Sequence, residues 1–342
     1  MIKTLSIKRF KSIRELSIAC RKVNVFIGAP DTGKTNILDA LTLLSRLGWY
    51  LPLDSSLRLR AELGFDALFY RQFYDAPLEI ALEADGKLAE DWERHLKTTS
   101  ISVQAVNDSA ARALRLRLGL PGAHRDMVGI PFGSGGHWPF FERIRQYAYL
   151  SSENWQYQGD RPRPVTPPNG SNLLYVARHD ESAYEFLLET VAPVGWKLRF
   201  DAAMKTFRLS EVREKEIIDY NLDLLSDSLK RLIFYGTIVL SSQEAVLVLD
   251  EPDVFAFPPY PKTLGQMIAA DATNQFFVTT HNPYFLSAVI EKTPTDQLAL
   301  FVCHRKEDGA TGARLLTLNE VSRVIEHGAS VFFNLDEFEA SA

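Results

Sequence analysis

The sequence predicts an α/β fold of two lobes, with a mixed and mainly parallel core sheet and an antiparallel β sublobe. The first observation is a set of short, continuous apolar runs separated by helical or loop segments, which is typical of strands buried in a parallel sheet. These runs are 245–249, 276–279 and 298–303. The second observation is a set of segments in which apolar and polar residues alternate, as in half-exposed antiparallel strands. These segments are 76–84, 99–106 and 111–118.

The N-terminal region predicts three strands followed by a helix. Apolar residues alternate with polar ones around Leu5 and Leu16, whereas the run 23–27 is almost entirely apolar. We therefore expect two half-buried strands and then one strand that is buried. From 34 to 47 the apolar residues recur at helical spacing, which predicts a helix directly after the third strand.

Two stretches rich in glycine and proline, 120–136 and 151–172, are typical of loops. We place the lobe boundary at the second stretch. This gives an N-terminal lobe of residues 1–150 and a C-terminal lobe of residues 151–342, and both lobes are expected to form one head. The chain shows no internal repeat and no sustained heptad pattern.

Composition excludes several classes of protein. The residues are 46% hydrophobic and the formal net charge is −5, so the chain has no overall attraction to nucleic acid. Only two cysteines occur, Cys20 and Cys303, which argues against a disulfide framework and a zinc site. No apolar stretch is long enough to cross a bilayer. We expect a cytoplasmic protein that does not bind membranes.

A phosphate-binding loop lies between the buried strand and the helix. The pattern G-x4-G-K-T allows consecutive backbone N–H groups to surround phosphates at the positive end of the helix dipole. Lys34 would reach the β and γ phosphates and Thr35 would bind Mg²⁺. The alternative is a glycine-rich turn before a surface helix. The predicted ATP-binding residues are Gly28, Ala29, Pro30, Asp31, Thr32, Gly33, Lys34, Thr35 and Asn36.

Two carboxylates follow the apolar run 245–249, in the form of a Walker B element. Asp250 would hold Mg²⁺, and Glu251 would polarise the attacking water as general base. Taken alone, this pattern also fits a strand that ends in an acidic turn at Pro252. The preceding phosphate-binding loop makes that alternative the minor one.

Two further segments carry candidate residues. His281 follows the run 276–279 at the edge where a parallel sheet binds its ligands, and it would contact the γ-phosphate. A structural histidine is the alternative. Ser226 precedes a helical apolar pattern and is a candidate N-cap, although many helices begin in this way.

The ordered motifs GAPDTGKT, LLSDSLKR, VLVLDEP and TTH resemble the SMC-like branch of ABC-type ATPases, close to the OLD-family and RecF-type AAA ATPases. The opening IKTLSIKRFKSI and the segments 36–40 and 169–173 (NILDA and NGSNL) fit the same branch. The resemblance implies a P-loop NTPase that binds ATP between two subunits. In such a homodimer Ser226 of one copy would meet the γ-phosphate bound by the other copy.

The chain departs from this branch at several points. Ser228 occupies a position where the family usually has glycine, which puts tight ATP-dependent dimerisation in doubt. The family's Q-loop glutamine is left unassigned, with Gln146, Gln156 and Gln158 nearby. Arg58 or Arg60 is the nearest match to an arginine that reaches the phosphates in SMC relatives. A nuclease (Toprim) domain, a long coiled-coil arm and a zinc hook are not visible.

Three functions remain open from the sequence. The leading one is a Mg²⁺-dependent ATPase that acts as a switch by dimerising around ATP, in DNA repair or phage defence. The alternative is a nucleotide-gated scaffold with weak turnover that controls a separate nuclease or toxin chain. A P-loop kinase or motor is the third, and the LLSDSLKR element argues against it.

DNA remains an open partner at a basic region interleaved with aromatic residues, where a solvated charged face is the simpler interpretation. The basic residues are Arg112, Arg115, Arg117, Arg125, Arg143 and Arg145, and the aromatic ones are Phe140, Phe141, Tyr147 and Tyr149.

Overall fold

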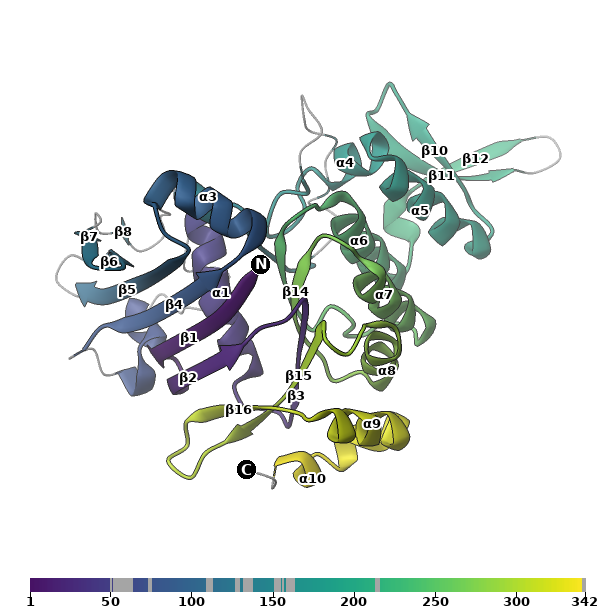
Figure 1. The fold of residues 1–342 in the computed structure, drawn as a ribbon. Coiled ribbons are helices and arrows are strands. Elements are labelled where there is room, and N and C mark those ends of the chain that lie inside the picture. The colour runs from purple at the N-terminus through teal and green to yellow at the C-terminus, as the bar shows by residue number, and fades with distance from the viewer. Residues whose placement is uncertain are drawn as a thin grey trace.

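The computed structural model (Figure 1) describes most of the chain. The described residues are 1–49, 51, 64–72, 76–108, 113–126, 130–131, 138–150, 155, 157, 164–212 and 216–339. Within them lie one mixed six-stranded sheet, one antiparallel seven-stranded sheet and one small three-stranded sheet. The predicted α/β fold is confirmed.

The six-stranded sheet forms the centre of the molecule, in the order β16-β15-β3-β14-β13-β9. Its strands are β3 (Val23–Gly28), β9 (Ile144–Tyr147), β13 (Val246–Asp250), β14 (Gln275–Thr279), β15 (Leu298–Arg305) and β16 (Thr311–Leu315). All neighbouring pairs are parallel except β15 with β16. The three apolar runs of the second half of the sequence are therefore parallel strands, as predicted. The N-terminal β3 lies between β15 and β14.

The seven-stranded sheet is antiparallel throughout, with the order β2-β1-β4-β5-β6-β7 and with β8 paired to β6. Its strands are β1 (Ile2–Phe10), β2 (Ile13–Ala19), β4 (Leu78–Ala84), β5 (Ser100–Asp108), β6 (Ala113–Leu120), β7 (Ala123–Asp126) and β8 (Ile130–Pro131). The predicted β sublobe is confirmed. The prediction of a loop over 120–136 is wrong at β7 and β8, because Gly122 provides a tight turn with φ +73° that lets β7 pair back onto β6.

Helix α1 lies on one face of the central sheet, and α6, α7 and α8 lie on the other (Figure 1). The helices in the described ranges are α1 (Lys34–Gly48), α3 (Gly86–Leu96), α4 (Leu173–His179), α5 (Glu181–Val191), α6 (Asp227–Ser241), α7 (Pro259–Ala270), α8 (Pro283–Lys292), α9 (Leu318–His327) and α10 (Asp336–Glu339). The small sheet consists of β10 (Lys197–Asp201), β11 (Thr206–Val212) and β12 (Ile217–Asn221). The helix predicted over 34–47 is α1. Helix α3 was not predicted.

The central sheet separates two hydrophobic cores. Alternate residues of β3 point to opposite sides: Phe26 lies in the core shared with α1 and the antiparallel sheet, whereas Val25 and Ile27 lie in the core under α6, α7 and α8. All three are fully buried, and each such side chain contributes about 1.5–3 kcal/mol through burial. The strand that leads into the phosphate-binding loop is therefore fixed from both faces.

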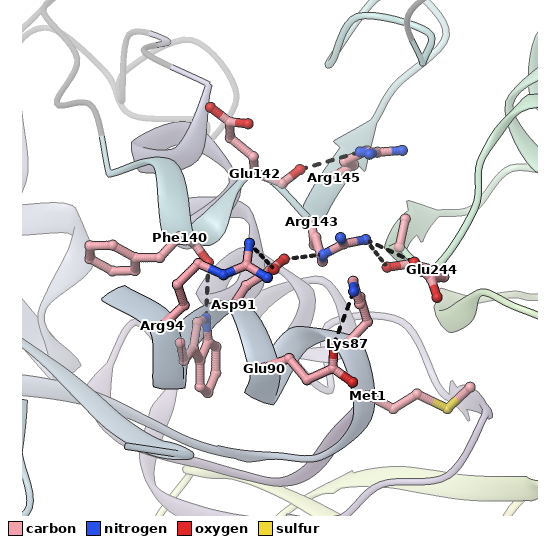
Figure 2. A network of polar contacts seen from close by, with 12 residues as sticks. Met1, Lys87, Glu90, Asp91, Arg94, Phe140, Glu142, Arg143, Arg145 and Glu244 are labelled. Atoms are coloured by element: carbon pink, nitrogen blue, oxygen red, sulfur yellow. Dashed lines mark hydrogen bonds and ion pairs between the residues drawn. The ribbon is translucent and has the colours of Figure 1, made fainter. Parts of the chain in front are cut away.

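Arg143 links α3 to the turn before β13 (Figure 2). Its Nε donates to the carboxylate of Asp91 on α3, and its Nη1 donates to the backbone oxygen of Glu244 at 3.1 Å. Trp92 on the same helix donates its indole N–H to the Phe140 oxygen at 2.9 Å. These contacts join α3 to β9 and β13 of the central sheet. The lobe boundary at residues 150 and 151 stays a prediction.

Candidate functional site

The turn between β3 and α1 is shaped by two glycines whose backbone conformations disfavour other residues. Gly28 has φ +149° and Gly33 has φ +91°, a region that side chains rarely occupy. A Cβ atom at Gly28 would lie 2.3 Å from the Cys303 oxygen, and one at Gly33 would lie 2.0 Å from Thr311 Oγ1. The loop therefore fits closely against β15 and β16.

Lys34 lies inside this loop. Its side chain is buried, and Nζ donates to the backbone oxygens of Gly28 at 2.9 Å and Ala29 at 2.7 Å. Burial lowers the pKa of Lys34, while the nearby carboxylates of Glu251 and Asp250 act in the opposite direction. The ammonium is thus held at the N-terminus of α1, where the helix dipole also favours an anion.

Thr35 and Asp250 meet at the carboxyl end of β13. Thr35 Oγ1 lies 3.2 Å from each carboxylate oxygen of Asp250, and Thr279 Oγ1 donates to Asp250 Oδ1 at 2.6 Å. A hydroxyl and a carboxylate at this spacing form an all-oxygen donor set, which suits Mg²⁺. The residues present therefore fit the ion.

Glu251 and His281 face each other at the ends of β13 and β14. His281 Nε2 lies 3.5 Å from Glu251 Oε1, and both side chains are about 40% exposed (38% and 40%). Thr279 Oγ1 accepts from the backbone N–H of Glu251 at 2.9 Å. The backbone of Glu251 has φ +48°, which turns the chain sharply after the strand. Burial, and then the charge of Lys34, lowers the pKa of His281, so the imidazole is neutral at pH 7.

A cavity of about 1070 Å³ is lined by several of these groups, whereas the predicted residues Gly28, Ala29, Thr32 and Asp250 do not line it. The predicted residues that line it are Pro30, Asp31, Gly33, Lys34, Thr35, Asn36, Glu251 and His281. Sequence reasoning missed the other lining residues, which are Lys11, Ser12, Asp39, Ala67, Phe69, Tyr70, Arg71, Arg305 and Gly309. A nucleoside triphosphate fits a space of this size, which is at the upper end of ordinary ligand pockets.

Some of the missed residues had a signal in the sequence. Lys11 and Ser12 belong to the segment IKTLSIKRFKSI that carries part of the family resemblance. Ser12 Oγ accepts from Asn36 Nδ2 at 2.6 Å and lies 2.6 Å from Thr311 Oγ1. Lys11 pairs with Asp39 of α1 at 2.5 Å. The β1–β2 turn thus supports the phosphate-binding loop from one side.

The signature segment lies away from this cavity. Ser226 is the N-cap of α6, where its Oγ accepts from the Leu229 N–H at 3.3 Å, and it is exposed. It is not among the residues that line the cavity. The hydroxyl of Ser228 accepts from the backbone N–H of Phe257 at 2.5 Å, in the loop that follows Glu251.

Other predicted residues are placed elsewhere or lie outside the described part of the chain. Gln146 is buried in β9 and does not line the cavity. Arg143 and Arg145 make internal contacts (Figure 2), and Phe141 and Tyr147 are fully buried, so this stretch forms no exposed basic and aromatic stripe. The residues outside the described ranges are Arg58, Arg60, Arg112, Gln156 and Gln158.

Comparisons with known proteins bear on the fold that holds these residues. Residues 1–116 match the AAA ATPase domain family. An SMC head bound to the C-winged helix domain of ScpA superposes with a TM-score of 0.60 at 16% identity, covering 94% of this chain and 99% of that one. An Smc head domain with an extended coiled coil, bound to the C-terminal domain of ScpA derived from Pyrococcus furiosus, gives a TM-score of 0.54 at 12% identity and covers 95% and 98%. No curated protein is similar enough in sequence to match.

The chain therefore has the fold of an SMC head. Together with the AAA ATPase domain match, this fold supports a nucleotide-binding ATPase. None of the helices in the described ranges is long and apolar enough to cross a membrane.

Proposed function

We propose that this protein binds and hydrolyses ATP with Mg²⁺ and that it acts as a switch by dimerising around the nucleotide. The observation that carries the proposal is the arrangement of Glu251 and His281, 3.5 Å apart, in one cavity with Lys34 and Thr35. This arrangement supplies phosphate binding, a metal site and a general base at one sheet edge.

Each residue has a role in the proposed reaction. Backbone N–H groups of the loop from Gly28 to Thr35 bind the phosphates, and Lys34 neutralises the β and γ phosphates. Mg²⁺ bound by Thr35 and Asp250 supplies further charge neutralisation when present. Glu251 accepts a proton from the attacking water, whose oxygen forms a bond to the γ-phosphorus. The bond between the γ-phosphorus and the bridging oxygen breaks, and ADP and phosphate leave.

His281 contributes a neutral imidazole beside the general base. In this form one ring nitrogen donates a hydrogen bond and the other accepts. The 3.5 Å separation of His281 from Glu251 supports a role in orienting that carboxylate and in contacting the γ-phosphate. The lowered pKa of His281 keeps the ring neutral near pH 7, so it does not form an ion pair that would weaken the base.

Steady-state ATPase assays test the reaction. We expect Lys34→Ala and Glu251→Gln to reduce kcat by at least a hundredfold. Glu244→Gln is a matched control, because Glu244 is also a glutamate with a left-handed backbone (φ +50°) next to β13, at the opposite end of the strand. Equal turnover in wild type and Lys34→Ala would refute the proposal.

The dimeric switch rests on Ser226. This serine caps the exposed N-terminus of α6 and does not line the cavity of its own chain. Its position supports a role toward the nucleotide that a second copy binds. Two exposed apolar side chains support such an interface: Leu224, two residues before Ser226, is 61% exposed, and Phe255 in the loop after Glu251 is 84% exposed. Sizing Glu251→Gln with and without ATP tests this: a dimer only with ATP supports the switch.

A nucleotide-gated scaffold is the second candidate, and the contact of Ser228 favours it. The hydroxyl of Ser228 accepts a hydrogen bond from Phe257 within its own chain. The LLSDSLKR segment thus differs from a signature segment that has glycine here, whose backbone can come close to the phosphate of a second copy. We further propose an OLD- or RecF-like role in DNA repair or phage defence, with DNA or a separate nuclease or toxin chain as partner. The two SMC heads compared above bind ScpA. A monomer that stays unchanged with ATP, together with slow turnover, would favour the scaffold.

A further inference from the structure

A buried carboxylate lies beneath the turn that carries Glu251. Asp253 is only 3% exposed, and the turn above it closes through a hydrogen bond from the Val254 N–H to the Glu251 oxygen at 3.3 Å. Thr280 Oγ1, which is also fully buried, donates to Asp253 Oδ2 at 2.6 Å. A buried carboxylate is costly unless it is hydrogen-bonded. The Thr280 hydroxyl supplies this hydrogen bond to Asp253.

The same hydroxyl fixes the residues on both sides of His281. Thr280 Oγ1 accepts from the Asn282 N–H at 2.9 Å. Asn282 in turn caps α8, since its Oδ1 accepts from the N–H groups of Tyr284 at 2.9 Å and Phe285 at 3.3 Å. The backbone that carries His281 is thus anchored to α8 on one side and to Asp253 on the other.

We infer that Asp253 is a positioning residue, which holds the His281 turn against the Glu251 turn through Thr280 and so sets the separation of the general base and the imidazole. This inference rests on the proposed function. Neither Asp253 nor Thr280 lines the cavity, and Asp253 is therefore expected to act through Glu251 and His281 rather than on the nucleotide.

The charges around Asp253 agree with this role. Burial raises its pKa to about 7, the Thr280 hydrogen bond acts in the opposite direction, and the Glu251 charge adds to the increase. The titratable groups around it are Glu251 on its own turn, Tyr235 on α6, whose pKa is raised in part by Asp253, and His281 after Thr280. The ionised form of Asp253 therefore lowers the stability of the fold.

Enzyme kinetics with a binding measurement test the inference. We expect Asp253→Val and Thr280→Val each to lower kcat at least tenfold while the Kd for a fluorescent ATP analogue changes less than twofold. The double variant should be no slower than the slower single variant, because each single variant removes the same hydrogen bond. Asp253→Asn keeps an acceptor oxygen and Thr280→Ser keeps the hydroxyl, so both should retain most of the wild-type kcat. Wild-type kcat in Asp253→Val would overturn the inference.

Thermal unfolding separates positioning from support of the fold. The folded pKa of Asp253, about 7, lies above the unfolded value, so this group lowers stability as pH rises from about 4 to about 7, and the loss is complete above that interval. Asp253→Val should therefore have a Tm at pH 8 no lower than wild type, in spite of its lower kcat. A lower Tm and a lower kcat together with a higher Kd would show a purely structural role.

An NMR titration makes the test independent of turnover. Thr280→Val introduces no charged group, but it removes the hydrogen bond that lowers the Asp253 pKa. The titration is therefore made in an Asp253→Asn background, which has no titrating group at this position. A shift of the His281 imidazole pKa on adding Thr280→Val then reports a displaced ring, and Thr280→Ser should show no shift. If wild type and Lys34→Ala hydrolyse ATP equally, the proposed function fails while this measurement still decides the inference. An unchanged His281 pKa in Thr280→Val would overturn it.

Discussion

The imidazole of His281 lies against the carboxylate of Glu251, with Nε2 3.5 Å from Oε1. The two residues come from different strand ends, β13 and β14, which are adjacent and parallel in the central sheet. Parallel pairing places Asp250 opposite Thr279. Glu251 and His281, which follow these two strands, therefore both lie at the carboxyl edge of the sheet. The sheet topology alone therefore brings the candidate base and the imidazole together.

Removing the imidazole should slow hydrolysis and leave nucleotide binding intact. We expect His281→Ala to lower kcat about a hundredfold, as for loss of a positioned acid–base group, because Lys34 and the loop still bind the phosphates. His95→Ala, on the exposed side of α3, serves as the control. Steady-state kinetics and titration with a fluorescent ATP analogue measure both quantities. A large rise in Kd with unchanged kcat would contradict the assigned role.

The close fit of the phosphate-binding loop predicts that Gly33→Ala abolishes nucleotide binding. A Cβ atom there would lie 2.0 Å from Thr311 Oγ1 and 2.8 Å from Ser12 Oγ, so the loop must move. Gly195→Ala is the matched control, because Gly195 has nearly the same φ (+88°) but no heavy atom within 4 Å of the new Cβ. The backbone strain of about 1–2 kcal/mol is then common to both variants.

Calorimetric titration with ATP and thermal unfolding compare the two variants. We expect Gly195→Ala to lose stability and still bind ATP, whereas Gly33→Ala loses binding as well. Equal binding by both variants would show that the contact with Thr311 does not constrain the loop.

The sequence predicted the central part of the site because its signals are local. The loop from Gly28 to Thr35 is bounded by a buried strand and a helix, and the carboxylates at 250 and 251 follow a continuous apolar run. Helix α3 also had a local signal: its buried residues Leu88, Ala89, Trp92 and Leu96 are spaced as one helical face. That signal was overlooked.

The rest of the cavity has no comparable local signal. Arg71 is held in a left-handed conformation (φ +52°) with its guanidinium over the Tyr70 ring, 5.2 Å from the centroid. Arg305 reaches the loop from the end of β15, where its Nε donates to the Asp31 oxygen at 3.2 Å. These residues reach the cavity only through the tertiary fold, so no motif in their own segments indicates a role.

The bridge made by Arg143 predicts a stability effect rather than a DNA-binding one. Its side chain is 23% exposed and donates to Asp91 and to the Glu244 oxygen. Arg143→Ala should lower the free energy of unfolding by about 1.5–3 kcal/mol, as for hydrogen bonds of charged groups. Arg94→Ala removes an exposed arginine 3.9 Å from the same Asp91 and should cost less than about 1 kcal/mol. Urea unfolding compares them, and equal losses would argue against the bridge.

Glu320 predicts a pH-dependent contribution to stability near the C-terminus of the described chain. Arg314 donates to both of its carboxylate oxygens (2.9 and 3.1 Å), and these contacts together with the Thr317 capping box lower its pKa to about 2. Because the folded pKa lies below the unfolded one, the stabilisation is present in full above about pH 5 and is lost as pH falls towards 2.

Glu320→Gln should therefore lower the Tm at pH 7 and have a smaller effect at pH 3. Glu337→Gln is the control, since Glu337 makes a more exposed pair with Arg323. Thermal unfolding at the two pH values measures the difference. An effect of Glu320→Gln that is independent of pH would show that the contribution does not depend on its charge.

Replacing Ser228 should change both stability and dimerisation, because this serine departs from the family pattern and accepts a hydrogen bond from Phe257. Ser228→Gly removes the acceptor of the Phe257 N–H, which should cost about 0.5–1.5 kcal/mol of stability, and it restores the residue that permits close backbone approach. If the hydroxyl limits dimerisation, the variant in a Glu251→Gln background should dimerise at lower ATP concentration than Glu251→Gln alone.

Ser228→Ala separates the two effects in the same background, since it removes the same hydrogen bond but keeps a Cβ atom. Sedimentation velocity over a range of ATP concentrations measures the dimer fraction. Stronger dimerisation with glycine and not with alanine would mean that the side chain itself obstructs the second copy. An equal gain with both would instead mean that the tether between α6 and the loop after Glu251 is what restrains it. No gain with either would favour the nucleotide-gated scaffold over the dimeric switch.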